Sequence, residues 1–131
     1  EEVVALAQTA QRYGGIYDSH IRSESTYSIG LLGSIEEVIN IAENADIPVH
    51  IAHLKALGVD VWGQSGDIIA RIEEARERGL TVTADQYPYR ASGTSFASAI
   101  IPAGIIRWLK PRPTLCQAGI FSVFVRRRSD R

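Results

Sequence analysis

Short runs of β-favouring residues recur along this chain at an almost constant interval, and each run ends in a polar side chain. The interval from His20 to His53 is 33 residues, and the interval from His53 to Asp85 is 32 residues. One strand, a crossover helix and their connections need about 30 residues. The spacing therefore predicts consecutive βα units of one parallel sheet, with strands over Gly15–His20, Val49–His53 and Leu80–Asp85.

Amphipathic segments lie between these runs. Apolar residues recur at helical steps from Glu1 to Ala10, and Gly14-Gly15 follows them. Ser34 and the glutamate three residues later form a capping-box pattern, which predicts that the second helix begins at Ser34 and ends near Ala45. A third helix is predicted over Asp67–Arg78. The order helix, strand, repeated three times, is typical of the α/β class.

The amino-acid composition limits the classes of partner and the compartment that we expect for this chain. The 131 residues contain 45% hydrophobic and 22% charged residues and have a net charge of −1, so nothing favours nucleic acid or an anionic membrane as a partner. No apolar span reaches 18 residues. The single cysteine, Cys116, excludes an internal disulfide and favours a reducing compartment, so we expect a cytoplasmic location. Because Met is absent even from position 1, we expect the sequence to begin within a longer protein.

The alternation of helices and strands ends near residue 100. The segment 101–131 contains three prolines and a basic end, and only its apolar run Ile120–Val125 could form a strand. We therefore divide the chain into residues 1–100, which carry the βα units, and residues 101–131, which stay unassigned.

Imidazoles at the ends of two neighbouring parallel strands could bind one metal ion. His20 and His53 are nitrogen ligands of the kind that Zn²⁺ or a similar divalent metal prefers, although a catalytic site needs further ligands. Asp85 could be a ligand, a proton carrier or, as we favour, a group that orients a ligand. The alternative is that both histidines are hydrogen-bonded structural residues.

Other polar and aromatic residues near the same edge allow substrate binding. Lys55 follows His53 by two residues and could hold a carboxylate, or could be a solvated loop lysine. Tyr87 and Tyr89 could line a pocket or pack in the core. His50 is three residues from His53, so strand alternation predicts that it faces the helices. Arg22 and Glu24 are expected to pair with each other or with the site.

Several motifs together resemble one known family. The segments SHIRSE, VHIAHLKALG, WG and VTADQYPYRASGTS are similar to those of the N-acyl-D-amino-acid deacylases, or D-aminoacylases, of the amidohydrolase superfamily. The resemblance covers about residues 1–100. It implies an α/β fold in which parallel βα units form a fragment, about strands five to seven, of a distorted (β/α)₈ TIM-like barrel.

The resemblance also implies roles for individual residues. His20 and His53 match the family's metal-binding histidines at the ends of the fifth and sixth strands. Lys55 matches a lysine that contacts the substrate carboxylate. Tyr87 matches a tyrosine of the substrate pocket, and Ser92 lies near a serine that contacts substrate.

The implied reaction is zinc-dependent hydrolysis of the amide of a small N-acyl-D-amino acid. The family's His-x-His pair, early cysteine ligand and general-base aspartate are not present in this chain. We therefore expect the isolated chain to supply part of the catalytic domain and to lack deacylase activity. A barrel fragment leaves two sheet edges unpaired, so we also expect self-association or pairing with a partner.

Two other functions also agree with parts of the sequence. A hydrolase of cyclic amides, such as a hydantoinase or dihydroorotase, would share the two histidines but is expected to lack the His-Leu-Lys and Tyr-Pro-Tyr segments found here. The second alternative is an inactive α/β binding or assembly module. Zinc affinity that depends on His20 and His53 would separate the metal-site functions from the module.

Overall fold

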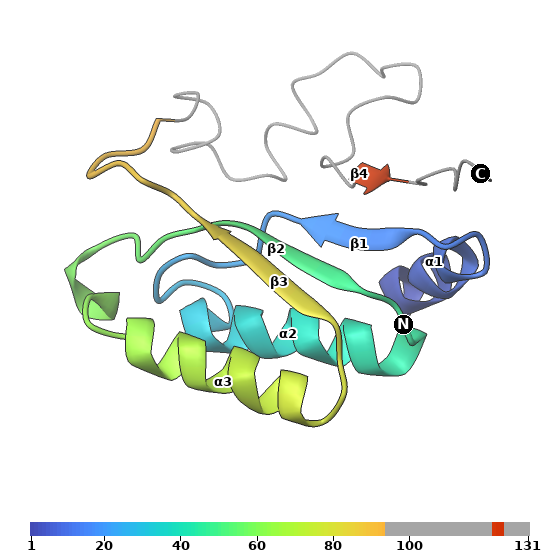
Figure 1. Cartoon of the computed structure of the whole chain (residues 1–131). Coiled ribbons are helices and arrows are strands. Elements are labelled where there is room, and N and C mark those ends of the chain that lie inside the picture. The colour runs from blue at the N-terminus through green and yellow to red at the C-terminus, as the bar shows by residue number, and fades with distance from the viewer. Residues whose placement is uncertain (94–121, 125–131) are drawn as a thin grey trace, which may run out of the picture. The chain divides into compact units, whose positions relative to one another are not determined.

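Helices alternate with the strands of one sheet, as Figure 1 shows. The computed structural model describes residues 1–93 and 122–124. Its elements are α1 (Glu2–Gln11), β1 (Ile16–Ser19), α2 (Gly30–Ala45), β2 (Val49–Leu54), the 3₁₀ helix η1 (Val59–Val61), α3 (Ser65–Glu77), β3 (Val82–Gln86) and β4 (Ser122–Phe124). The predicted order of three helices and three strands is confirmed.

The sheet has the order β3-β2-β1-β4. β1 and β2 are parallel, with Tyr17 opposite Val49, and β2 and β3 are parallel, with Val49 opposite Val82. The prediction of parallel βα units is therefore confirmed. The carboxyl ends of β1, β2 and β3 lie on the same side of the sheet, which is the left-hand side of Figure 1.

One edge of the sheet differs from the expectation. β4 pairs antiparallel with β1, with Ile16 opposite Phe124, so the expected second unpaired edge at β1 is covered. The possibility of a strand within Ile120–Val125 is confirmed for Ser122–Phe124. On the other side, β3 is the terminal strand of the sheet among the described residues.

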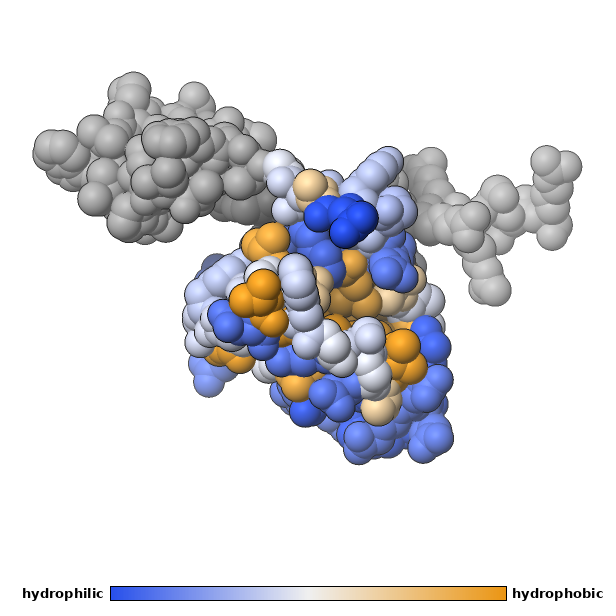
Figure 2. All heavy atoms as spheres, turned by 90° about the vertical axis from the view of Figure 1, so that its left-hand side faces the viewer, coloured by the Kyte–Doolittle hydropathy of each residue, from blue (hydrophilic) through white to orange (hydrophobic). Residues whose placement is uncertain are grey.

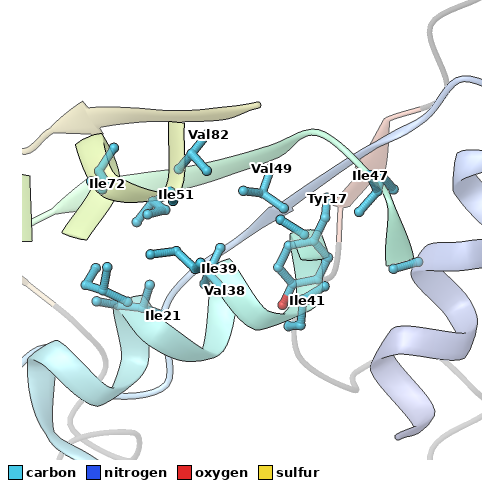
Figure 3. Packing of buried hydrophobic residues seen from close by; sticks show 14 of the residues in the cluster. Tyr17, Ile21, Val38, Ile39, Ile41, Ile47, Val49, Ile51, Ile72 and Val82 are labelled. Carbon is cyan, nitrogen blue, oxygen red and sulfur yellow. The ribbon is translucent and has the colours of Figure 1, made fainter. Parts of the chain in front are cut away.

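Helices α2 and α3 cover one face of the sheet, and isoleucines of α2 pack against β2 (Figures 1 and 3). Ile35 and Ile51 are completely buried. Removing each such side chain from water stabilises the fold by about 1.5–3 kcal/mol. The cluster consists of buried residues Ala7, Ala10, Tyr17, Ile21, Leu31, Ile35, Val38, Ile39, Ile41, Ala42, Ala45, Ile47, Val49, Ile51, Val61, Ile68, Ile72, Ala75 and Val82.

Helix α2 begins four residues before the predicted start, at Gly30, so the capping-box prediction was wrong. Ser34 is completely buried inside the helix. Its hydroxyl donates to the carbonyl of Gly30 at 2.9 Å and accepts the backbone N–H of Ser23 at 2.8 Å. Burial of Leu31 in the first turn extends the helix toward its amino terminus, because the added turn places another apolar side chain in the core.

The chain divides into two compact units, each described by itself. The first contains Glu1–Tyr87 and β4, and the second begins at Pro88. The predicted division at residue 100, and most of the segment 101–131, lie outside the described residues. Among the helices of the described part, none combines the length and apolar character needed to cross a lipid bilayer.

The buried contact between Ser34 and Ser23 gives a stability prediction. We expect Ser34→Ala to lower the free energy of unfolding by about 1–3 kcal/mol, because the buried N–H of Ser23 would lose its acceptor. Urea unfolding followed by circular dichroism measures the change. The control is Thr9→Ala, which removes a similar hydroxyl-to-carbonyl bond on the exposed side of α1 and should change stability by less than about 0.5 kcal/mol. Equal effects of the two substitutions would contradict this role of Ser34.

Candidate metal centre

The two histidines at the strand ends lie in direct contact. His20 follows β1 directly, and His53 lies near the end of β2, so the parallel register brings both to one edge of the sheet. The Nδ1 atom of His20 is 3.2 Å from the Nε2 atom of His53. The ring centroids are 4.8 Å apart and the ring planes are tilted by 49°. One nitrogen of each ring therefore faces the same small volume.

A β-bulge sets the orientation of His53. Between the pairs Ile51–Ala84 and Leu54–Gln86, β2 contains one more residue than β3. His53 adopts φ = 41°, a left-handed conformation that costs a residue with a Cβ atom about 1–3 kcal/mol. Its backbone N–H donates to Oδ1 of Asp85 on β3. Asp85 therefore holds the strained backbone of His53, in agreement with the orienting role that we favoured.

A buried carboxylate lies beneath the two rings. Glu24 is 4% exposed, and its Oε1 atom is 3.5 Å from Nδ1 of His20 and 3.5 Å from Nδ1 of His53. The same oxygen accepts from Nζ of Lys55 at 2.5 Å. Lys55 also lies 2.9 Å from Nδ1 of His53. A carboxylate removed from water needs such partners, because an unpaired buried charge is costly.

Electrostatics favour a neutral His20. Partial loss of hydration is the main effect that lowers the pKa of His20; Glu24 acts in the opposite direction, and His53 and Lys55 lower the pKa further. Metal coordination requires an unprotonated ring nitrogen. A lowered pKa therefore makes His20 available to a metal ion at neutral pH.

The donor set fits a zinc ion. Two nitrogens bound to a tetrahedral Zn²⁺ at about 2.0–2.1 Å are about 3.3 Å apart, and the observed separation between His20 and His53 is 3.2 Å. Glu24 adds a carboxylate oxygen, and one ligand atom from each of the three residues lies within 4.8 Å of the others. These three residues offer one ligand atom each, which is one fewer than four-coordination requires.

The centre lies at an open surface. Figure 2 shows the face at the carboxyl ends of the strands, where hydrophobic groups are scattered among hydrophilic ones. A cavity of about 620 Å³ between α1, α2 and β1 is lined by His20, but not by His53, Glu24 or Lys55. This cavity therefore does not enclose the centre.

The residues predicted to bind substrate are only partly brought together. Lys55 contacts His53, and its Nζ lies 5.0 Å from the ring centroid of Tyr87. Tyr89 is 71% exposed, which is against core packing for that residue. Ser92 is exposed and belongs to the second unit, so its predicted role stays a prediction.

The predictions for His50 and Arg22 were wrong. His50 does not face the helices: it accompanies Thr83 on the other face of the sheet, where its Nδ1 is 2.8 Å from the Thr83 hydroxyl. The bulge adds a residue before His53, so strand alternation counted from His53 gives the wrong face for His50. Arg22 pairs with Glu37 on α2 at 2.6 Å, so its predicted pairing with Glu24 or the site was wrong. Glu24 does contact the site, as the second form of that prediction allowed.

Glu24 is the carboxylate at the middle of the site, but it was not among the residues predicted from the sequence to bind metal or substrate. Its position was one indication of this role, because Glu24 follows His20 by four residues in a segment with several polar groups. Arg22 was a nearer possible partner in sequence, but the turn after β1 exposes Arg22 and buries Glu24. The ion pair with Lys55, 31 residues away, depends on the pairing of β1 with β2.

Comparison with known proteins identifies relatives of this chain. No family model matches it. D-aminoacylase of Alcaligenes xylosoxydans xylosoxydans is 35% identical over 118 residues, which make up 88% of this chain and 24% of that protein. N-acyl-D-glutamate deacylase of the same organism is 31% identical over 93 residues, or 71% of this chain and 18% of the relative. The chain thus spans about a quarter or less of the length of these relatives.

A solved structure agrees with the sequence relatives. The crystal structure of N-acyl-D-glutamate deacylase from Bordetella bronchiseptica, complexed with zinc and a phosphonate inhibitor that mimics the tetrahedral intermediate, superposes with a TM-score of 0.62. The match has 34% sequence identity and covers 67% of this chain and 18% of that chain. The resemblance that the sequence motifs indicated is confirmed, and so is the fold that it implied.

The contact between Asp85 and His53 predicts a pH effect on stability. The His53 backbone N–H is the main cause that lowers the pKa of Asp85 below its ordinary value of about 3.9. Because folding lowers this pKa, the carboxylate stabilises the folded chain above its unfolded pKa, and that stabilisation is lost as the pH falls through the folded-state value. We expect Asp85→Asn to destabilise the chain near neutral pH and to match wild type at the acid end.

Urea unfolding at several values between about pH 6 and pH 2 measures this difference. Asp60→Asn is the control, because Asp60 is an exposed carboxylate in η1, which follows β2. Its stability curve should run parallel to that of the wild type. A constant difference between Asp85→Asn and wild type at every pH would show that the carboxylate is not held by His53.

Proposed function

We propose that this chain, which shares the sequence and fold of one segment of the N-acyl-D-amino-acid deacylase family, contributes metal ligands and a carboxylate-binding lysine to the hydrolysis of N-acyl-D-amino acids. The observation that carries the proposal is the 3.2 Å approach of His20 Nδ1 to His53 Nε2, beside Lys55. The relatives named as D-aminoacylase and N-acyl-D-glutamate deacylase support this substrate class.

Each residue of the centre has a separate task in this proposal. His20 and His53 hold the metal; when bound, a zinc ion lowers the pKa of a water molecule and polarises the acyl carbonyl. Lys55 contacts the carboxylate of the substrate with its ammonium group. Tyr87 contacts the substrate beside Lys55, because its ring lies 5.0 Å from the Lys55 ammonium. Ser92 is proposed as a further substrate contact on the basis of its sequence motif alone.

Linear N-acyl substrates are favoured over cyclic amides. The sequence relatives are named for deacylation of D-amino acids, and the crystal structure from Bordetella bronchiseptica is named for D-glutamate. In this chain Lys55 lies 2.9 Å from Nδ1 of a proposed metal ligand. A positive charge in that position suits a substrate that carries a carboxylate next to its scissile amide. We also propose a cytoplasmic location, supported only by the single cysteine.

Zinc binding tests the proposal directly. We expect the 131-residue chain to bind Zn²⁺, and we expect His20→Ala and His53→Ala each to weaken the affinity by more than the roughly 10- to 100-fold that loss of an outer partner costs. Isothermal titration with zinc chloride measures these affinities.

His50→Ala is the matched control, since His50 is the third histidine of the chain and its ring contacts Thr83 and, at 3.7 Å, Asp85, but is not one of the proposed metal ligands. It should retain zinc binding. If the wild-type chain has no zinc affinity, or if all three substitutions act alike, the metal role fails and the inactive binding module is favoured. Circular dichroism of each variant shows whether it has folded.

The free edge of the sheet supports a second prediction. β3 is the terminal strand of the described sheet, and Thr83–Gln86 are exposed along it. We propose that this edge pairs with another copy or with a partner, because unpaired strand edges bind other strands. Light scattering behind a sizing column should give a mass that rises with protein concentration. A monomer mass that does not change over the concentration range would contradict the proposal.

A further inference from the structure

Glu24 occupies a position that joins the proposed metal ligands to the proposed substrate-binding lysine. Its side chain is 5% exposed, and its Oε1 atom lies within 3.5 Å of nitrogen atoms of His20, His53 and Lys55. By contrast, the side chains of His20 and His53 are 58% and 40% exposed. The carboxylate thus lies on the protein side of the centre, where it contacts the ligands from behind.

Hydrogen-bond chemistry defines the present arrangement of protons. A lysine ammonium only donates, so Nδ1 of His53 must accept from Lys55 at 2.9 Å. The ring proton of a neutral His53 is then on Nε2. That N–H points to Nδ1 of His20, which accepts it at 3.2 Å. Lys55 meanwhile has three acceptors: Glu24 Oε1, His53 Nδ1 and the His53 carbonyl at 3.3 Å.

Metal coordination through the same face requires a different arrangement. The nitrogen of His53 that faces His20 is Nε2, and a metal-bound nitrogen cannot carry a proton. The proton on Nε2 leaves to solvent and Nδ1 takes one up, so the total number of protons on His53 is unchanged. Nδ1–H and the Lys55 ammonium are then both donors, and they cannot share a hydrogen bond.

Glu24 is the acceptor that resolves this conflict. Its Oε1 atom is 3.5 Å from Nδ1 of His53, a distance that a small rotation of the ring can shorten to a hydrogen bond. Carboxylates commonly accept the second N–H of a metal-bound histidine and hold the ring in one tautomer. The Lys55 N–H that had donated to Nδ1 is released at the same time.

We propose that Glu24 is a positioning residue that couples zinc binding at His53 to carboxylate binding at Lys55. It accepts Nδ1–H of His53 when zinc occupies Nε2, and it keeps Lys55 in place with one ammonium N–H free for the substrate carboxylate. This inference rests on the proposed function of the chain, since it concerns the same centre. It predicts that Glu24 supports zinc binding and that Lys55 opposes it.

The tautomer of His53 provides the first test. In the full chain labelled with ¹⁵N-histidine, long-range ¹H–¹⁵N correlation spectra distinguish the Nδ1–H and Nε2–H tautomers of each ring. Only three histidines are present, and the His53 signals are those lost in His53→Ala. We expect addition of zinc chloride to change His53 from the Nε2–H to the Nδ1–H tautomer. This change shows that zinc occupies Nε2 of His53, as the inference requires; the role of Glu24 itself is tested by its substitution.

Zinc affinities of two variants provide the second test. We expect Glu24→Gln to lower zinc affinity by about 10- to 100-fold, because the amide lacks the negative charge that favours the Nδ1–H tautomer. We expect Lys55→Met to raise zinc affinity, because it removes a positive charge and a competing donor at Nδ1. Glu36→Gln is the matched control: it removes the carboxylate on α2 that pairs with Arg71 on α3, and it should leave the zinc affinity and the His53 tautomer unchanged.

The outcomes separate this inference from the proposed function. If the wild-type chain binds zinc through both histidines but Glu24→Gln keeps the wild-type affinity, the inference is wrong and the metal site stands. If Glu24→Gln and Lys55→Met lower the affinity alike, Glu24 supports only the fold, and the inference is also wrong. If the wild-type chain binds no zinc, the proposed function and the inference both fail.

Discussion

The parallel pairing of β1 with β2 is the constraint on which the candidate centre depends. This register places His20 beside His53, and it brings Glu24 from the turn after β1 to Lys55 after β2. The pairing itself is stabilised by the apolar face that both strands bury against α2. Burial of apolar side chains on one face of the sheet stabilises the strand pairing, and this pairing keeps the polar and charged side chains at the sheet edge in contact.

His53 keeps an unfavourable backbone conformation because surrounding contacts stabilise it. A left-handed residue with a Cβ atom is unfavourable by about 1–3 kcal/mol, yet the bulge allows His53 to face His20 instead of alternating with its neighbours. The carboxylate of Asp85 accepts the backbone N–H that the bulge removes from the regular ladder. Strain of this kind is typical of functional sites, where geometry matters more than local stability.

Buried charges at the centre are also paired with charges of opposite sign. Glu24 is buried and neutralises Lys55, so the centre combines a carboxylate, an ammonium group and two imidazoles within a few contacts. Arg22, by contrast, is exposed and pairs with Glu37 on the outer side of α2. The turn after β1 thereby directs one charged residue to the site and the other to the surface. Two of the relatives that the chain resembles are named D-aminoacylase and N-acyl-D-glutamate deacylase, and one structure that it matches contains zinc.

The sequence by itself determined the order of helices and strands, the parallel pairing and the approach of His20 to His53. These follow from hydrophobic periodicity and from the nearly constant interval between strand ends. Both patterns depend only on the order of residues along the chain. Tertiary structure alone decided the early start of α2, the face of His50 and the burial of Glu24. Each of these depends on contacts between distant segments: Ser34 with Ser23, β2 with β3 across the bulge, and Glu24 with Lys55. Neighbouring residues do not specify such contacts, because their free energy depends on burial that arises only when the strands pair.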